Sequence, residues 1–335
     1  MTAEGLVTLA DVRRARDRIA GGVRTTPLLP APWPAAGGRP QSDAPDRVWL
    51  KCENLQWVSA FKARGALHFV GKLSADERAA GLITYSSGNH AQAVAFAARS
   101  YGVPARIVMP VDAPQVKRQA TVAMGAEVEF VGTTSAERKE RAEEILREDG
   151  GTMVPPFDHP DIIAGQGTVG LELVEQLGGR KPGVVLVPIG GGGLLGGVAA
   201  AVRGLAPDAR IVGVEPEGAA SMLRSLEGGG PVTLDRVDTI ADGLKPVRPG
   251  DLTYRHARDL VDDVVTVDDA SIRDAVRWLF ARRLVVEPSG AATVAALMSG
   301  AGGADQTDPA ADGETVAVLS GGNIEPSLLI EWLRD

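Results

Sequence analysis

Residues 51–66 read K-C-E-N-L-Q-W-V-S-A-F-K-A-R-G-A and begin inside an apolar, strand-like run over residues 48–52. Lys62 lies in the second half of this stretch, directly after Phe61. Burial penalises the ammonium form of a lysine, so apolar cover would favour a neutral, nucleophilic amine. Gly65 leaves room for a planar ligand close to the backbone. Such a lysine suits a covalent bond to a carbonyl compound, although the same letters also fit a surface lysine that starts a helix.

The composition of the 335-residue chain is that of a globular protein with a sizeable core, since 44% of residues are hydrophobic and 23% are charged. The net charge is −8 and no basic run occurs, so we expect no nucleic-acid partner. No apolar run approaches the roughly 18 residues that span a bilayer, so we expect no membrane partner. Cys52 is the single cysteine and cannot form an internal disulfide. These features predict a cytoplasmic protein.

Short apolar runs alternate with helical segments along most of the chain. Residues 82–85 and 105–109 are predicted strands with an Ala-rich helix between them, and such helical crossovers imply parallel strands. A second series of strands and helices begins after residue 160. We therefore predict an α/β fold of two units with a cleft between them: a large domain of residues 1–80 and 160–335, and a small domain of residues 81–159.

Four consecutive glycines, from Gly190 to Gly193, follow a buried strand and precede a helix predicted over residues 198–205. Backbone N–H groups at such a position form a phosphate site. The run also satisfies the pattern G-x-G-x-x-G, and Glu215 follows about 20 residues later, as the ribose-binding acid of a dinucleotide fold does. The loop alone therefore leaves a phosphate group and a nicotinamide dinucleotide as alternatives.

Two more turns follow predicted strands. Residues 86–90 read S-S-G-N-H and offer hydroxyls, an amide and backbone N–H groups to a carboxylate. Residues 320–323 read S-G-G-N. Each turn by itself also fits an ordinary helix cap or a structural turn. Both lie at the carboxyl ends of predicted parallel strands, where α/β proteins bind ligands.

The Lys62 stretch, the S-S-G-N-H turn, the tetraglycine loop and the S-G-G-N turn occur in the order seen in fold-type II pyridoxal-phosphate enzymes. The chain resembles the threonine/serine dehydratase and serine racemase branch over nearly its whole length, including A-G-Q-G-T at 164–168 and A-D-G at 241–243. The resemblance implies a two-domain, tryptophan synthase β-like fold with parallel sheets flanked by helices and pyridoxal 5'-phosphate in the cleft between the domains. It also gives Lys62 a role that the dinucleotide interpretation lacks.

The resemblance implies roles for individual residues. Lys62 would hold the cofactor as an imine and move the Cα proton, while Phe61 would flank the ring. Ser87 would be a second catalytic residue, because serine racemases carry a serine there as the base on the opposite face of Cα. The implied ligands are Asn89 for the 3-oxygen, Ser320 for the pyridine nitrogen, Gly190, Gly191, Gly192, Gly193 and Leu194 for the phosphate, and Ser86, Ser87, Gly88, Asn89 and His90 for the substrate carboxylate.

A serine at the pyridine nitrogen cannot stabilise a pyridinium as an aspartate would, so the ring would be a weaker electron sink. This favours direct loss of a β-substituent. We therefore expect an L-threonine/L-serine dehydratase, an ammonia-lyase that forms 2-oxobutyrate or pyruvate and ammonia. Ser87 keeps serine racemase and hydroxyaspartate dehydratase open as alternatives. A nicotinamide-dependent dehydrogenase and a non-catalytic scaffold are alternatives of other classes.

The resemblance also bears on metal binding and assembly. Glu215 matches an acidic ligand of the divalent-cation site of serine racemases, and Ala219 could offer a carbonyl. Ser221 stands where the family pattern has a second acid, so the sequence gives little reason to expect a bound divalent cation. The family also implies a homodimer that acts on a small amino acid.

Overall fold

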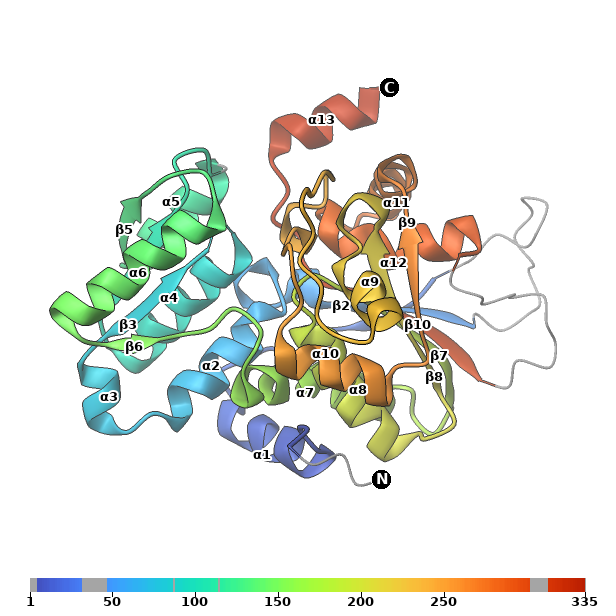
Figure 1. The fold of residues 1–335 in the computed structure, drawn as a ribbon. Coiled ribbons are helices and arrows are strands. Elements are labelled where there is room, and N and C mark those ends of the chain that lie inside the picture. Colours follow the sequence, from blue (N-terminus) through green and yellow to red (C-terminus); the bar gives the residue numbers. More distant parts are fainter. Residues whose placement is uncertain (1–4, 32–46, 87, 114, 302–312, 335) are drawn as a thin grey trace.

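The computed structural model describes residues 5–31, 47–86, 88–113, 115–301 and 313–334 of the chain. These residues form one sheet of six strands and one of four, and helices pack around both (Figure 1). Neighbouring strands run parallel throughout, except for the antiparallel pair of β1 and β2. This is the arrangement of parallel sheets flanked by helices that the sequence predicts.

The strand order of each sheet shows that segments far apart in the chain lie side by side. Across the larger sheet the strands are β1 (Leu28–Pro30), β2 (Val48–Cys52), β10 (Glu314–Leu319), β7 (Pro182–Pro188), β8 (Arg210–Pro216) and β9 (Asp263–Val267). Across the smaller sheet they are β5 (Glu127–Phe130), β4 (Ala105–Met109), β3 (Leu82–Tyr85) and β6 (Thr152–Met153). The segment predicted as the small domain contains all four strands of the smaller sheet, while the domain limits themselves stay a prediction.

Helices make up most of the remaining described residues. They are α1 (Leu9–Ile19), α2 (Lys62–Lys72), α3 (Ala75–Ala79), α4 (Asn89–Tyr101), α5 (Gln115–Ala123), α6 (Ser135–Asp149), α7 (Pro160–Gln176), α8 (Gly193–Leu205), α9 (Ser221–Gly228), α10 (Asp251–Leu260), α11 (Asp269–Ala281), α12 (Pro288–Ser299) and α13 (Pro326–Arg334). Short 3-10 helices are η1 (Glu53–Leu55), η2 (Trp57–Ser59), η3 (Glu217–Ala219) and η4 (Asp242–Leu244). Among the described residues, no helix combines the length and the apolar character needed to cross a bilayer.

The larger sheet is buried on both faces, which explains its continuous β-branched runs. On β7, Val185 and Val187 pack against side chains of α7 and α8, including Leu195. Leu186 points to the opposite face and packs with α11 and α12, including Ile272. Each burial of a side chain of this size contributes about 1.5–3 kcal/mol relative to exposure. The central strands are therefore rigid supports for the loops at their carboxyl ends.

The smaller sheet lies between α4 and α6. Leu82 and Ile107 pack on the side of α4 and α2, whereas Ile83 and Val108 pack against α6. α2 packs on α4 beside the smaller sheet and also against Ile162 of α7, a helix that covers the larger sheet. The helix that begins at Lys62 is thus held by contacts from both parts of the molecule.

Candidate active site

The Lys62 stretch and the turn at residues 320–323 lie side by side. Ala60 and Gly321 form an antiparallel β-bridge, and the Phe61 N–H donates to the Ser320 carbonyl at 3.1 Å. Ser320 follows β10, the strand next to β2 in the larger sheet. Two motifs that are about 260 residues apart are therefore joined by backbone contacts, as their shared position at the carboxyl edge of the sheet predicts.

The backbone immediately before Lys62 is strained. Val58 has a φ of 55° and Ser59 a φ of 50°, a left-handed conformation that non-glycine residues rarely adopt. The Asn323 side chain donates to the Val58 carbonyl at 2.8 Å, and the Gly322 N–H donates to the Ser59 carbonyl at 2.8 Å. The S-G-G-N turn thus holds the strained segment in place. Strain of this kind is found mostly where a reacting group has to be placed.

Lys62 is the first residue of α2, and its amine has no carboxylate partner among the described residues. The Nζ atom donates to the Pro156 carbonyl at 2.6 Å and lies 5.2 Å from the centre of the Phe61 ring. Burial lowers the pKa of Lys62 to about 8. The neutral form of this amine is therefore far more populated near neutral pH than that of an ordinary lysine, so it can act as a nucleophile.

The backbone of the tetraglycine loop lies so close to neighbouring atoms that residues with side chains would not fit there. A Cβ on Gly191 would lie 2.3 Å from the Phe157 ring, and Gly192 has a φ of 92°. The Thr253 hydroxyl donates to the Gly191 carbonyl at 2.7 Å and fixes the loop. Leu194 follows in the buried first turn of α8, whose N–H groups have no partners within the helix. This cradle at a helix N-terminus fits a phosphate group.

Asn89 opens α4 and is held from two sides. Its Nδ2 donates to Glu287 Oε1 at 2.5 Å, and the Asn323 side chain donates to Asn89 Oδ1 at 2.9 Å. An amide nitrogen has two N–H groups, so one of them remains to contact a ligand. Asn89 therefore lies beside the turn of residues 320–323 and fits the role of a cofactor ligand.

The turn that precedes α4 is ordered by its own hydrogen bonds. The Gly88 N–H donates to Ser86 Oγ at 3.3 Å, and His90 Nε2 lies 3.1 Å from the Val154 carbonyl. Burial, with the nearby charge of Lys62, lowers the pKa of His90 to about 3, so this ring is neutral and positions the turn. Ser87 lies outside the described residues.

The structure also brings together three charged residues to which the sequence assigned no role. Lys117 on α5 forms ion pairs with Asp242 and Glu287, and Glu287 in turn accepts the hydrogen bond from Asn89. One sequence signal for Glu287 exists. It occupies the N-cap position of α12, where serine, threonine, aspartate or asparagine is preferred, and its side chain makes no capping hydrogen bond.

Glu215 does not fit a divalent-cation site. Its carboxylate is fully buried and accepts the N–H groups of Met222 at 2.8 Å and Leu223 at 2.9 Å, so it caps the start of α9. Burial raises the pKa of Glu215 to about 7. Ser221 is buried beside it, and its hydroxyl has no hydrogen-bond partner among the described residues. No cluster of His, Cys, Asp and Glu side chains suited to a metal ion occurs in the described part of the chain.

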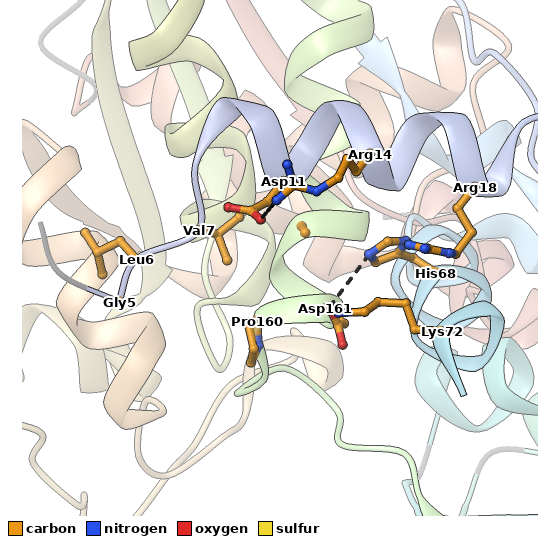
Figure 2. Close-up of a pocket in the computed structure, with 11 residues that line it drawn as sticks. Gly5, Leu6, Val7, Asp11, Arg14, Arg18, His68, Lys72, Pro160 and Asp161 are labelled. Carbon is orange, nitrogen blue, oxygen red and sulfur yellow. Dashed lines mark hydrogen bonds and ion pairs between the residues drawn. The ribbon is translucent and has the colours of Figure 1, made fainter. Parts of the chain in front are cut away.

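A separate cavity of about 300 Å³ lies between α1, α2 and α7 (Figure 2). Charged side chains line it, including the ion pairs Arg14–Asp11 and Lys72–Asp161. His68 Nε2 faces Asp161 Oδ1 at 3.8 Å (Figure 2). None of the predicted site residues lines this cavity. The candidate active site is therefore defined by the converging loops and not by this cavity.

Comparisons with known proteins agree with this geometry. Residues 19–321 match the family described as "Pyridoxal-phosphate dependent enzyme". The chain is 38% identical over 321 residues to the serine racemase of Schizosaccharomyces pombe, covering 96% of this chain and 95% of that protein. It is 39% identical over 320 residues to the L-threo-3-hydroxyaspartate ammonia-lyase of Saccharomyces cerevisiae, covering 95% and 94%. The structure of threonine deaminase isoform 2 from Solanum lycopersicum, in its processed form, matches with a TM-score of 0.85 and 36% identity, covering 97% and 86%.

The fold and the converging loops define an α/β enzyme of the type that binds its cofactor between two parallel sheets. The chain belongs to the pyridoxal-phosphate-dependent enzymes of fold type II. The predicted fold class and cofactor are thereby confirmed. The nicotinamide interpretation of the glycine run is wrong. Its ribose-binding acid would be Glu215, which instead caps α9.

Proposed function

We propose that the protein is an ammonia-lyase that converts L-threonine and L-serine to 2-oxobutyrate and pyruvate with release of ammonia. The observation that carries this proposal is the Lys62 amine, with its lowered pKa, at the start of α2 beside the Ser320 turn. Relatives of similar sequence identity are a serine racemase, an L-threo-3-hydroxyaspartate ammonia-lyase and an L-threonine ammonia-lyase. The choice among these activities therefore rests on the residues of the site.

Pyridoxal phosphate, when bound, supplies an electron sink for the bonds at the substrate Cα. Lys62 would hold it covalently and then accept the Cα proton, because its amine is neutral above about pH 8. Phe61 would cover the ring, and Asn89 would donate to the 3-oxygen. Ser320 would place a neutral hydroxyl at the pyridine nitrogen, which weakens the sink and favours loss of the β-hydroxyl.

The phosphate would be held by the backbone of residues 190–194, with Gly190, Gly191, Gly192, Gly193 and Leu194 each exposing an N–H group to it. The substrate carboxylate would bind where α4 begins. Ser86, Gly88, Asn89 and His90 form this turn, and the positive end of the helix favours an anion there. Both anions would thus sit at helix N-termini, and the reacting carbon would lie between them near Lys62.

The second candidate function is either racemisation of serine or dehydration of hydroxyaspartate. The relatives in Schizosaccharomyces pombe and Saccharomyces cerevisiae carry these names, and Ser87 is the proposed base for the opposite face of Cα. A panel of serine, threonine and hydroxyaspartate enantiomers, assayed for oxo acid and for inversion, separates the candidates. Ser87→Ala should spare dehydration of L-threonine and remove inversion, and equal loss of both would show another role for Ser87.

The main test locates the covalent bond to the cofactor. Borohydride reduction followed by peptide mass mapping should place the label on Lys62. The Lys62→Ala variant should lose turnover of L-threonine by at least about 10³-fold, because both the attachment point and the proton acceptor are gone. Normal turnover in that variant, or a label on another lysine, would end the proposal.

We also propose that the protein is a homodimer and that it is cytoplasmic. Leu55, Trp57 and Val285 are large apolar side chains that are 40–45% exposed, and the Asn54 side chain donates to the Val285 carbonyl, which brings the segment that contains Leu55 and Trp57 next to residue 285. Such a patch supports a homodimer. Cys52 is the single cysteine, and burial raises its pKa to about 12, which suits a cytoplasmic protein with no need of disulfides.

A further inference from the structure

The buried charges next to Asn89 form a cluster that joins the two sheets. Lys117 on α5 is 3% exposed and belongs to the part of the chain around the smaller sheet. Its partners, Asp242 in η4 and Glu287 at the start of α12, belong to the part around the larger sheet. The distance from Lys117 Nζ to Glu287 Oε2 is 3.5 Å. One ammonium group therefore lies between two carboxylates at the junction.

The cluster has one positive and two negative charges, so Lys117 decides the protonation of its neighbours. Burial raises the pKa of Glu287, the charge of Lys117 opposes this, and Asp242 adds to the rise. Burial disfavours the charged form of Lys117, but Glu287 and Asp242 outweigh it and raise the pKa of Lys117. Lys117 thus stays protonated over the whole physiological range. Its charge lowers the pKa of Glu287 against the effect of burial, and so favours the ionised carboxylate of a residue that is only 1% exposed.

Gly88, the N-cap of α4, and Asn89, its first residue, both lie against this cluster. Glu287 Oε1 accepts from the Asn89 side chain at 2.5 Å, whereas Oε2 faces Lys117 Nζ at 3.5 Å. A Cβ added to Gly88 would lie 3.3 Å from Lys117 Nζ, so the backbone of the turn rests on the lysine side chain. The orientation of the Asn89 amide depends on Glu287 acting as an acceptor for its N–H group. A protonated Glu287 could donate a hydrogen bond instead, and the amide oxygen of Asn89 could then turn toward it.

We propose that Glu287 and Lys117 are positioning residues. Glu287 orients the Asn89 amide toward the bound cofactor, and Lys117 keeps Glu287 ionised while supporting Gly88 in the turn that receives the substrate carboxylate. The inference rests on the proposed function, since it assumes that the cofactor is attached at Lys62. Neither positioning residue is expected to touch the reacting atoms.

The test measures the bound cofactor and not only turnover. Purified wild-type protein and the variants Glu287→Gln, Lys117→Met and Lys117→Arg are titrated with pyridoxal phosphate, and visible spectra are recorded between about pH 6 and 9. Lys72→Met is the matched control, because Lys72 also joins two helices through an ion pair, with Asp161, but lies outside the site. Circular dichroism and thermal midpoints confirm that each variant is folded.

We expect Lys117→Met and Glu287→Gln to bind pyridoxal phosphate about 10–100-fold more weakly, the range typical for loss of a group that orients a ligand. In Lys117→Met the opposing charge is gone, so Glu287 should take up a proton more readily and the spectrum should depend more on pH than that of the wild type. Glu287→Gln should show an altered but pH-independent spectrum. Lys117→Arg should restore the wild-type spectrum, and Lys72→Met should match the wild type throughout.

The spectra distinguish a failure of the proposed function from a failure of this inference alone. Wild-type protein without cofactor absorbance would overturn the proposed function and this inference together. Wild-type absorbance combined with unchanged spectra and affinities in Lys117→Met and Glu287→Gln would overturn this inference alone. Equal weakening in the folded Lys72→Met control would also overturn it, because the effect would then be one of general stability.

Discussion

Lys62 differs from a surface lysine in its surroundings and not in its chemistry. The amine meets a carbonyl oxygen and an aromatic ring but no described carboxylate, so burial lowers its pKa without compensation. Lys51 shows the contrast within the same stretch. Burial lowers its pKa as well, but Glu172 holds the charged form at 2.7 Å. One lysine of the stretch is therefore a fixed charge, and the other is a reactive amine.

This contrast predicts how the cofactor-free protein reacts with a trace amount of acetic anhydride. The neutral amine is the reactive form, so labelling of Lys62 should rise with pH and reach half its maximum near pH 8. A lysine model compound added to the same reaction should reach half its maximum only near its ordinary pKa of about 10.4. Mass spectrometry of the Lys62 peptide and of the model compound measures both. Parallel curves for the two would contradict the lowered pKa of Lys62.

The left-handed Ser59 allows a second prediction at this scale. A left-handed L-residue costs about 1–2 kcal/mol, and glycine avoids this cost but loses about 0.5–1 kcal/mol of chain entropy on folding. Ser59→Gly should therefore stabilise the protein by about 0.5–1 kcal/mol in urea unfolding. Ser74→Gly is the control, because Ser74 has a φ of −63° and caps α3, so the change should destabilise slightly. A loss of stability in Ser59→Gly would show that the strain lies elsewhere.

The crossing of α7 and α8 shows how glycines act at the scale of elements. A Cβ on Gly197 would lie 2.2 Å from the Ile163 carbonyl, and one on Gly167 would lie 2.7 Å from the Gly197 carbonyl. The two helices thus approach until their backbones touch. Since α8 begins in the tetraglycine loop, the close crossing also places its N-terminus against the loop that carries Phe157.

Gly197→Ala should consequently destabilise the protein by about 1–3 kcal/mol, because the methyl group can be accommodated only by moving a helix. Gly230→Ala serves as the control, since nothing lies within 4 Å of its added Cβ, and should change stability by less than about 0.5 kcal/mol. Denaturant unfolding compares the two. Equal small effects would show that the helices can separate without cost.

At the scale of the whole molecule, a buried ion network ties the larger sheet to α2 and α7. Arg64 donates to Glu53 at 2.7 Å and 2.8 Å and to Glu172 at 2.7 Å and 2.9 Å, and Lys51 completes the network. Burial opposes the charge of Arg64, but Glu53 and Glu172 more than offset this and raise its pKa. Because Arg64 is two residues after Lys62, the network also fixes the start of α2.

Removing one partner from such a network leaves a buried charge without compensation. Glu53→Gln should cost about 3–5 kcal/mol of folding free energy. Asp238→Asn, which breaks the exposed pair with Arg236, should cost at most about 1 kcal/mol. Urea midpoints at constant pH measure both changes. Similar small losses would show that water or neighbouring groups replace the carboxylate of Glu53.

The sequence alone determined the elements whose signals are local. Strands Val48–Cys52, Leu82–Tyr85 and Ala105–Met109 have the predicted limits, because each is a short apolar run between clear breaks.

Strand β9 and helix α10 were not predicted from the sequence. Helix α8 begins at Gly193, five residues before the predicted start at Val198. Glycine has low helix propensity, and only contacts such as that with Phe157 explain glycines in a first turn.

The order of four loop motifs was likewise enough to identify the family and the cofactor, since each motif has a fixed backbone requirement. The Lys117 cluster was decided only by the tertiary structure. Its members are 125 and 170 residues from Lys117 along the chain, and nothing local marks them as partners. The attraction between two charges depends on their distance in space. The pairing of Lys117 with Asp242 and Glu287 is therefore set by how the two sheets pack together and not by any pattern along the chain.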